Sequence, residues 1–221
     1  LDKICQWTED RQMELNVTKT KFMVINFTNN FQFNTRINLG DTLLEEVKEC
    51  RLLGLTLTNQ LSWHQNTQNI VKKANTRMII LQKLYEFNLP TEEMLSIYIL
   101  FIRCIVEYCC VVWHSSVTVE EGSSIERVQK TALRIILKED YIDYSSALLL
   151  TGLERLKDRR TQLSLSFAKK CVKSKLSENL FPENEKLVNT RQHEKYFVTP
   201  ARTERLAKSS IPYLQRLLND K

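Results

Sequence analysis

The stretch MLSIYILFIRCIVEYCCVVW, from Met94 to Trp113, contains the most apolar twenty residues of the chain. Its length is that of a membrane span, since about 20 apolar residues cross a bilayer core. Arg103 and Glu107 interrupt it, and each charge near a bilayer centre costs about 2.5–3.5 kcal/mol on the insertion scale. The two side chains are four residues apart, so they can pair along one turn of a soluble helix. The pattern favours a helix that is apolar nearly all round and buried among other helices, with a membrane span as the alternative.

Helical spacing of apolar residues continues on both sides of this stretch. Ser62 is the expected N-cap of a helix that ends near Glu86. The apolar face of that helix is expected to hold Ile70, Ala74, Ile80, Leu81 and Leu84. After a loop over residues 115–124, further helices are expected over residues 125–137, from the turn 143–146 to residue 150, over 154–176 and over 211–218.

The N-terminal part of the chain has a different period. Residues 22–27 form a β-rich run, a turn cluster follows at 28–30, and residues 31–39 are expected to return as a strand. One or two further strands are expected over residues 43–58, with Gly54 inside them as a bulge or a point of close backbone approach. These patterns predict an α+β fold, mainly helical, in which a short antiparallel β-hairpin region precedes a helical bundle. The expected domains are residues 1–60, 61–150 and 151–221.

The composition is that of a soluble globular protein, with 43% hydrophobic and 26% charged residues. The six cysteines show no disulfide or zinc spacing, which predicts reduced thiols in an intracellular compartment, nuclear or cytoplasmic. Cys109, Cys110 and His114 come nearest to a metal site. The two cysteines point about 100° apart on a helix, so buried core cysteines are the favoured interpretation and no metal is expected.

The net charge of +6 belongs to the last third of the chain, where residues 138–221 carry 17 basic and 11 acidic side chains. Such an excess indicates a polyanion as partner, and a lysine-rich solvated surface is the equal alternative. On the expected helix over 154–176, one face holds Leu153, Leu156, Leu163 and Phe167. The side chains expected to follow phosphates on the opposite side are Arg155, Arg159, Arg160, Lys169, Lys170 and Lys173.

Several short motifs follow one another along the whole chain in a recognisable order. The N-terminal one reads W-x7-LN-xx-KTK-x-M, from Trp7 to Met23. The next is CRLLGLTL at residues 50–57, and the helical part contains IERVQ at 125–129 with ALR at 132–134. The remaining matches are Tyr98, Tyr108 and Trp113, then Leu153, Leu156 and Arg159-Arg160, and finally Arg202-Thr203-x-Arg205 and Ser210-Ile211-Pro212.

Together these motifs resemble the C-terminal portion of the reverse transcriptases of non-LTR, LINE-like retrotransposons of the Jockey or CR1 kind. The resemblance implies the end of a polymerase palm, then a helical thumb and a basic helical extension. Its partners would be an RNA template and a DNA primer, bound without sequence preference, and the rest of the polymerase. The family holds two Mg²⁺ ions on aspartates of a strand and of an F/Y-x-D-D hairpin, and this chain has no D-D or F-x-D-D sequence. The chain begins at Leu1 within an apparent helix, so we expect a catalytically incomplete fragment without a cofactor of its own.

The resemblance also implies roles for single residues in the complete enzyme. Lys19 stands where the family has a lysine that can donate a proton to the leaving pyrophosphate, and a solvated lysine is the alternative. Leu53 and Gly54 lie in the strand pair that would grip the primer, against the alternative of an ordinary buried strand. Tyr98, Tyr108 and Trp113 are expected to be core residues rather than base-stacking platforms. The rival function is a decayed or domesticated helical interaction module without a nucleic-acid role.

Overall fold

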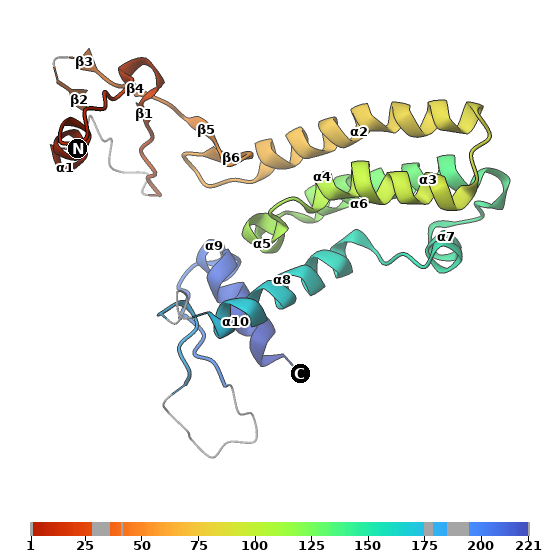
Figure 1. Ribbon diagram of the computed structural model, residues 1–221. Helices are drawn as coiled ribbons and strands as arrows, with labels where there is room; N and C mark the ends of the chain where they lie inside the picture. Colours follow the sequence, from red (N-terminus) through yellow and green to blue (C-terminus); the bar gives the residue numbers. More distant parts are fainter. Residues whose placement is uncertain (1, 28–35, 41, 175–178, 185–194, 221) are drawn as a thin grey trace. The chain divides into compact units, whose positions relative to one another are not determined.

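The computed structural model describes residues 2–27, 36–40, 42–174, 179–184 and 195–220. The chain divides into two units, Leu1–Asn66 and Thr67–Lys221. Short strands lie in the first unit and helices dominate the second (Figure 1). The predicted α+β class, mainly helical with small hairpins near the N-terminus, is confirmed. The expected domain borders at residues 60 and 150 stay a prediction.

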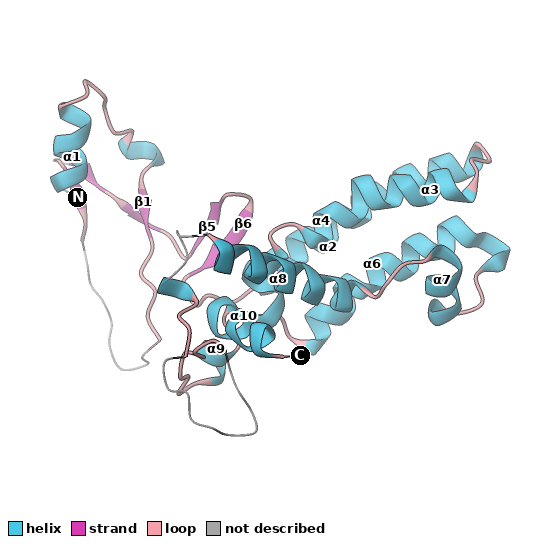
Figure 2. Ribbon diagram, turned by 60° about the horizontal axis from the view of Figure 1, so that its bottom comes forward, coloured by secondary structure: helices cyan, strands magenta, loops and turns pink. Residues whose placement is uncertain are grey.

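The described part of the first unit holds two short helical segments and three pairs of strands. They are α1 (Asp2–Glu9), the 3-10 turn η1 (Val17–Lys19), β1 (Lys21–Phe22), β2 (Asn38–Leu39), β3 (Thr42–Leu43), β4 (Glu45–Glu46), β5 (Glu49–Leu52) and β6 (Leu55–Thr58). β1 pairs in parallel with β4, and β2 pairs antiparallel with β3. β5 and β6 form an antiparallel pair (Figure 2). The strand expected over 22–27 is wrong beyond Phe22, and the turn at 28–30 with most of its return strand lies outside the described residues.

β5 and β6 form a hairpin whose two-residue turn is Leu53-Gly54. The backbone φ is +47° at Leu53 and +88° at Gly54. Two successive residues with positive φ are typical of a type I′ turn, whose twist matches that of the flanking strands. The bulge expected at Gly54 is therefore wrong, because the glycine lies where the chain reverses and not inside a strand.

The second unit is built from helices, and α2 leads into it from the first. The helical segments are α2 (His64–Glu86), α3 (Thr91–Ile97), the π-helical η2 (Tyr98–Arg103), α4 (Cys104–Glu107), α5 (Cys110–Trp113), the 3-10 turn η3 (His114–Ser116), α6 (Val119–Leu137), the 3-10 turn η4 (Lys138–Asp140), α7 (Tyr144–Thr151), α8 (Leu156–Lys173), α9 (Glu204–Ala207) and α10 (Ser210–Asn219). A β-bridge between Glu183 and Tyr196 joins the irregular segments before α9.

The apolar stretch is not one regular helix. The π-helical η2 interrupts it, and Cys109, with φ +48°, separates α4 from α5. Its buried side chains recur every four residues as far as Cys110, and they are Met94, Tyr98, Ile102, Val106, Cys110 and then Trp113. A step of four residues exceeds one turn of an α-helix, so such a stripe would drift around a regular helix. The π segment has more residues per turn, which reduces that drift.

Only one face of the apolar stretch is buried. Leu100 is 66% exposed and Phe101 is 50% exposed, so the expected burial on all sides is wrong. By length and composition, Thr91–Ser116 is able to cross a membrane. Core helices of soluble proteins pass the same test. The expected pair is present, since Arg103 Nε lies 3.6 Å from Glu107 Oε1.

α2 has a narrower buried stripe than its sequence predicts. Ile70, Ala74, Met78 and Leu81 are buried, whereas Ile80, expected on this face, is 42% exposed. Met78 follows Ala74 by four residues and so shares its face, which Ile80 does not. Ser62 Oγ accepts a hydrogen bond from His64 N over 3.3 Å, at the predicted start of this helix.

α6 begins earlier than expected because it has a capping box. Thr118 accepts a hydrogen bond from Glu121 N, and the Glu121 carboxylate accepts one from Thr118 N. The helix therefore starts at Val119, and the loop predicted over residues 115–124 is shorter. α7 follows the predicted turn over 143–146: Asp143 caps its first turn, and Gly152 ends it with φ +64°.

The predicted helix over 211–218 is confirmed as α10, which packs on α8. A buried apolar cluster joins the two helices. It contains Ala168 of α8, Leu214 of α10, and Phe181 from the segment between α8 and α9. Two amides of α10 hold irregular backbone on its other sides. The side chain of Gln215 accepts a hydrogen bond from Thr199 N and donates one to Leu180 O. The side chain of Asn219 accepts from Tyr196 N and donates to Tyr196 O.

Candidate nucleic-acid interface

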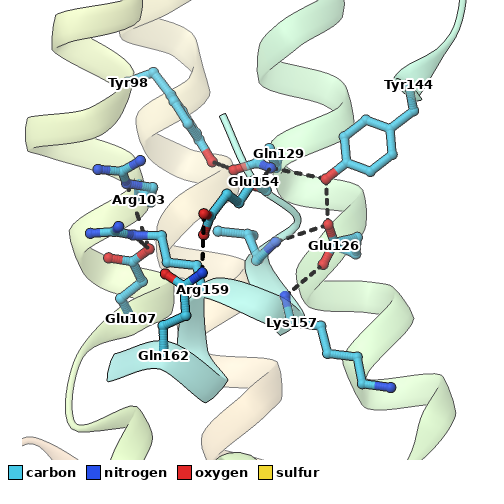
Figure 3. Close-up of polar contacts among 11 residues, drawn as sticks. Tyr98, Arg103, Glu107, Glu126, Gln129, Tyr144, Glu154, Lys157, Arg159 and Gln162 are labelled. Carbon is cyan, nitrogen blue, oxygen red and sulfur yellow. Dashed lines mark hydrogen bonds and ion pairs between the residues drawn. The ribbon is translucent and has the colours of Figure 1, made fainter. Parts of the chain in front are cut away.

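Gln129, on α6, is fully buried and joins four segments of the second unit. Its Oε1 accepts a hydrogen bond from the Tyr98 hydroxyl over 2.7 Å, and its Nε2 donates to the Tyr144 hydroxyl and to Glu154 O (Figure 3). Burial raises the pKa of Tyr98 well above its ordinary value, so this hydroxyl stays protonated and donates. The contacts link η2, α6, α7 and the residues that lead into α8.

Glu126, one turn before Gln129, caps the start of α8. Its Oε1 accepts from Leu156 N over 3.0 Å, and its Oε2 accepts from Lys157 N over 3.3 Å (Figure 3). The Tyr144 hydroxyl also donates to Oε1. Burial and this carboxylate both raise the pKa of Tyr144. A carboxylate at a helix N-terminus satisfies amides that have no partner within the helix and is favoured by the helix dipole.

Arg159 does not project freely from α8. Its Nε donates to Glu107 Oε1 over 2.6 Å, and the Glu107 side chain is only 13% exposed. The same carboxylate is 3.6 Å from Arg103 Nε. Arg159 is therefore engaged in holding α8 to α4, although the sequence places it among the side chains expected to follow phosphates.

Arg160 is not on the exposed face at all. It is 1% exposed, and its guanidinium carbon lies 5.7 Å from the ring centroid of Trp113. The buried stripe of α8 runs through Leu156, Arg160, Ser164 and Ala168, so the face predicted from Leu163 and Phe167 is wrong. An arginine can occupy this stripe because an aromatic face attracts its cation.

The remaining predicted cations of α8 are exposed. Lys169, Lys170 and Lys173 line a shallow depression of about 390 Å³ together with Gln162, Leu165 and Ser166. None of the three lysines forms an ion pair with another described residue. Arg155 is exposed just before α8 begins. We call Lys169, Lys170 and Lys173 the lysine patch.

The predicted residues of the first unit are all solvent-accessible. Lys19 ends the 3-10 turn η1 and is exposed. Lys21, its neighbour in the KTK motif, forms an ion pair with Glu45 over 2.8 Å. Leu53 is 83% exposed at the tip of the β5–β6 hairpin, so the alternative of a buried strand does not describe it.

Cys110 and His114 are both buried among protein side chains. Burial raises the pKa of Cys110 to about 11, which keeps its thiol protonated. His114 contacts Arg160 and Thr161 instead of a cysteine. Among the described residues, no group of three His, Cys, Asp or Glu side chains is placed to hold a metal ion. Tyr98 and Trp113 are core residues as predicted, but Tyr108 is half exposed.

The network around Gln129 and Glu126 was missed from sequence. One signal was available: Gln129 lies four residues after Ile125 and four before Leu133, which places it on the predicted apolar face. A polar residue in such a stripe needs a buried partner. No family model, no curated protein and no solved structure matches this chain.

Proposed function

We propose that this chain is the palm-end and thumb portion of a retrotransposon reverse transcriptase and holds template–primer duplex without reading its sequence. The observation that carries the proposal is the lysine patch. Three exposed lysines without described acidic partners lie on one helix, in the part of the chain that holds the whole net positive charge. Phosphates along a duplex are the partners that such a patch fits.

The motifs that carry the family resemblance also have a clear physical role in the helices. Within IERVQ, Ile125 is buried, Glu126 caps α8 and Gln129 is the buried hydrogen-bonding residue. Arg159, from the Arg159-Arg160 pair, forms an ion pair with Glu107, which directly precedes Tyr108. These contacts hold α4, α6 and α8 together. A thumb needs such rigidity to keep its basic surface at a fixed place.

The proposal divides the cations of the C-terminal third into two groups. Arg155 and the lysine patch are the phosphate contacts, whereas Arg159 and Arg160 position α8. In the complete enzyme the Leu53-Gly54 turn would lie against the primer backbone, and Lys19 would donate a proton to pyrophosphate. The catalytic Mg²⁺ ions would belong to the rest of the polymerase, which in this family carries the F/Y-x-D-D hairpin. The proposed location is intracellular, either nuclear or cytoplasmic, and the proposed partners do not include a membrane.

The test is the salt dependence of binding to an RNA–DNA duplex. Each neutralised phosphate contributes about −0.9 to the slope of log K against log salt on duplex DNA. The variant Lys169→Gln/Lys170→Gln/Lys173→Gln is expected to reduce the slope by about 2 to 3. The matched control is Lys72→Gln/Lys73→Gln/Lys83→Gln, which removes the same charge from exposed positions of α2. Equal losses in both variants, or a binding constant that barely changes with salt, would contradict the proposal.

A second function has its own observation in its favour. Large apolar side chains are exposed on α2, on the turn after it and on η2, and they are Ile79, Ile80, Tyr85, Phe87, Leu100 and Phe101. Exposed apolar surface of this kind marks interaction sites. A helical protein-interaction module would bind through this surface and show no salt-sensitive duplex binding. In the reverse transcriptase proposal, the rest of the polymerase would cover it.

A further inference from the structure

A pocket of about 450 Å³ lies in the second unit where the first turns of α6 and α8 meet α10. It is distinct from the depression at the lysine patch. Its wall is polar and cationic on one side and lined by small residues of α6 on the other. The lining residues used below are His114, Gly122, Glu126, Arg155, Lys157 and Arg160.

Arg160 brings a buried charge with an unused donor to this pocket. Its Nε donates to His114 Nδ1 over 3.3 Å, and its guanidinium lies over Trp113. Its Nη1 is buried and has no hydrogen-bond partner in the part of the chain that the structure describes. Burial lowers the pKa of Arg160, with Glu126 as the largest opposing influence. A buried charge that lacks partners is destabilising, so an anion in the adjoining pocket would lower the cost of burying this guanidinium.

His114 holds Arg160 in position through a hydrogen bond. Its ring is uncharged, so it adds no positive charge to the pocket. Arginine can only donate, so His114 Nδ1 must accept and the proton of the ring resides on Nε2. Nε2 lies 3.1 Å from Thr161 Oγ1. Burial and the charges of Arg160 and Lys157 lower the pKa of His114 to about 4, so the ring is neutral at pH 7.

The balance of charge in the pocket favours an anion. Arg155, Lys157 and Arg160 face one carboxylate, that of Glu126. Both oxygens of Glu126 already accept hydrogen bonds, from the first amides of α8 and from Tyr144. Arg155 and Lys157 are exposed and lie at the pocket together with the buried guanidinium of Arg160. Three cations suit a ligand with more than one negative charge. A phosphate group is such a ligand, since its net charge at pH 7 is about −1.5 to −2.

We propose that this pocket binds a phosphate group, with the buried charge of Arg160 in its wall and Arg155 and Lys157 as flanking cations. A guanidinium offers several N–H donors in a fixed fork that matches tetrahedral oxyanions. The pocket is roomy enough for a substituent, so the phosphate can belong to a larger molecule. The pocket shares Arg155 with the duplex proposal but none of the three residues of the lysine patch, so the two can be tested separately.

Gly122 allows a test that leaves Arg160 untouched. A Cβ added at Gly122 has no heavy atom within 4 Å, and the residue is in the first part of α6, where added acid is tolerated. Gly122→Glu introduces a carboxylate into the pocket wall, and Gly122→Gln introduces the same volume without charge. Urea unfolding of both variants establishes that they fold.

Inorganic phosphate is titrated calorimetrically into the full chain at constant ionic strength, with sodium chloride as the balancing salt. We expect saturable binding of one phosphate, weakened at least about tenfold more by Gly122→Glu than by Gly122→Gln, because like charges repel at short range. Absence of saturable phosphate binding, or equal dissociation constants for the two variants, would overturn the inference.

Two oligonucleotides that differ only in a 5′-phosphate identify the source of the group. If only the phosphorylated strand binds more weakly to Gly122→Glu than to Gly122→Gln, the ligand is a terminal phosphate. If both strands do, it is a phosphodiester of the backbone, and if neither does while inorganic phosphate does, it is a free phosphate compound. Each result supports the phosphate pocket. Lysine-patch variants should change duplex binding but not inorganic phosphate binding, so the two proposals can fail separately.

Discussion

The carboxylate of Glu126 caps a helix that begins thirty residues later: its Oε1 accepts a hydrogen bond from Leu156 N over 3.0 Å. This contact and the one between Glu126 Oε2 and Lys157 N fix where α8 begins relative to α6. They also set the position of everything that α8 carries, which includes the lysine patch, the ion pair of Arg159 and the buried Arg160. The polar face of α6 therefore positions the basic face of α8.

Replacing Glu126 should destabilise the second unit. We expect Glu126→Gln to lower the free energy of unfolding by about 1 kcal/mol, because one capping oxygen and the charge are lost, and Glu126→Ala by about 2 kcal/mol. Urea denaturation followed by circular dichroism measures both. The control is Glu139→Gln, which removes an exposed carboxylate beyond the end of α6. A loss of the same size in the control would rule out the capping role.

Local signals in the sequence predicted much of the fold. Asp143 and Gly152 bracket α7 because a cap and a left-handed glycine act through neighbouring backbone alone. The burial of Arg160 could not be predicted, since the aromatic ring and the histidine that accept it come from Trp113 and His114, far away in the sequence. A charged residue within a basic helix is ordinarily exposed. The division of that helix into exposed lysines and paired or buried arginines depends on such distant partners.

Gln129 and Tyr98 should be energetically coupled. Gln129→Leu leaves the buried Tyr98 hydroxyl without its 2.7 Å acceptor, and we expect a loss of about 2–3 kcal/mol in unfolding free energy. Tyr98→Phe removes the orphaned hydroxyl. The double variant should therefore be more stable than the sum of the single losses predicts, by about 1 kcal/mol. Strict additivity in this cycle of urea unfolding measurements would show that the hydrogen bond contributes nothing.

Stability should fall in mild acid because of His114. Burial, Arg160 and Lys157 lower its pKa from the usual 6.5 to about 4, so the unfolded chain takes up a proton before the folded one does. This contribution is complete above pH 6.5 and is lost as the pH falls toward 4, by up to about 3 kcal/mol. Unfolding free energies at a series of pH values measure it.

The matched pair for this measurement is His114→Gln and His64→Gln, since His64 is exposed. His114→Gln should flatten the profile between pH 6.5 and 4, and His64→Gln should leave it as in the parent. If His114→Gln keeps the full acid sensitivity, another group is responsible for it.

Leu53 provides the sharpest separation between a structural and a functional role. A leucine is disfavoured at this hairpin tip on two grounds. Its φ of +47° lies in the left-handed region, which bulky side chains avoid. Its apolar side chain is 83% exposed, so it gains no stabilisation from burial. Asparagine adopts this conformation readily and precedes glycine in many type I′ turns. We expect Leu53→Asn to stabilise the β5–β6 hairpin by about 0.5–1 kcal/mol, measured by amide hydrogen exchange of β5 and β6.

If the turn contacts the primer, the same variant should bind RNA–DNA duplex more weakly although its hairpin is more stable. Duplex binding that is unchanged, or that rises with the stability of the hairpin, would show that the exposed leucine has no part in holding the primer.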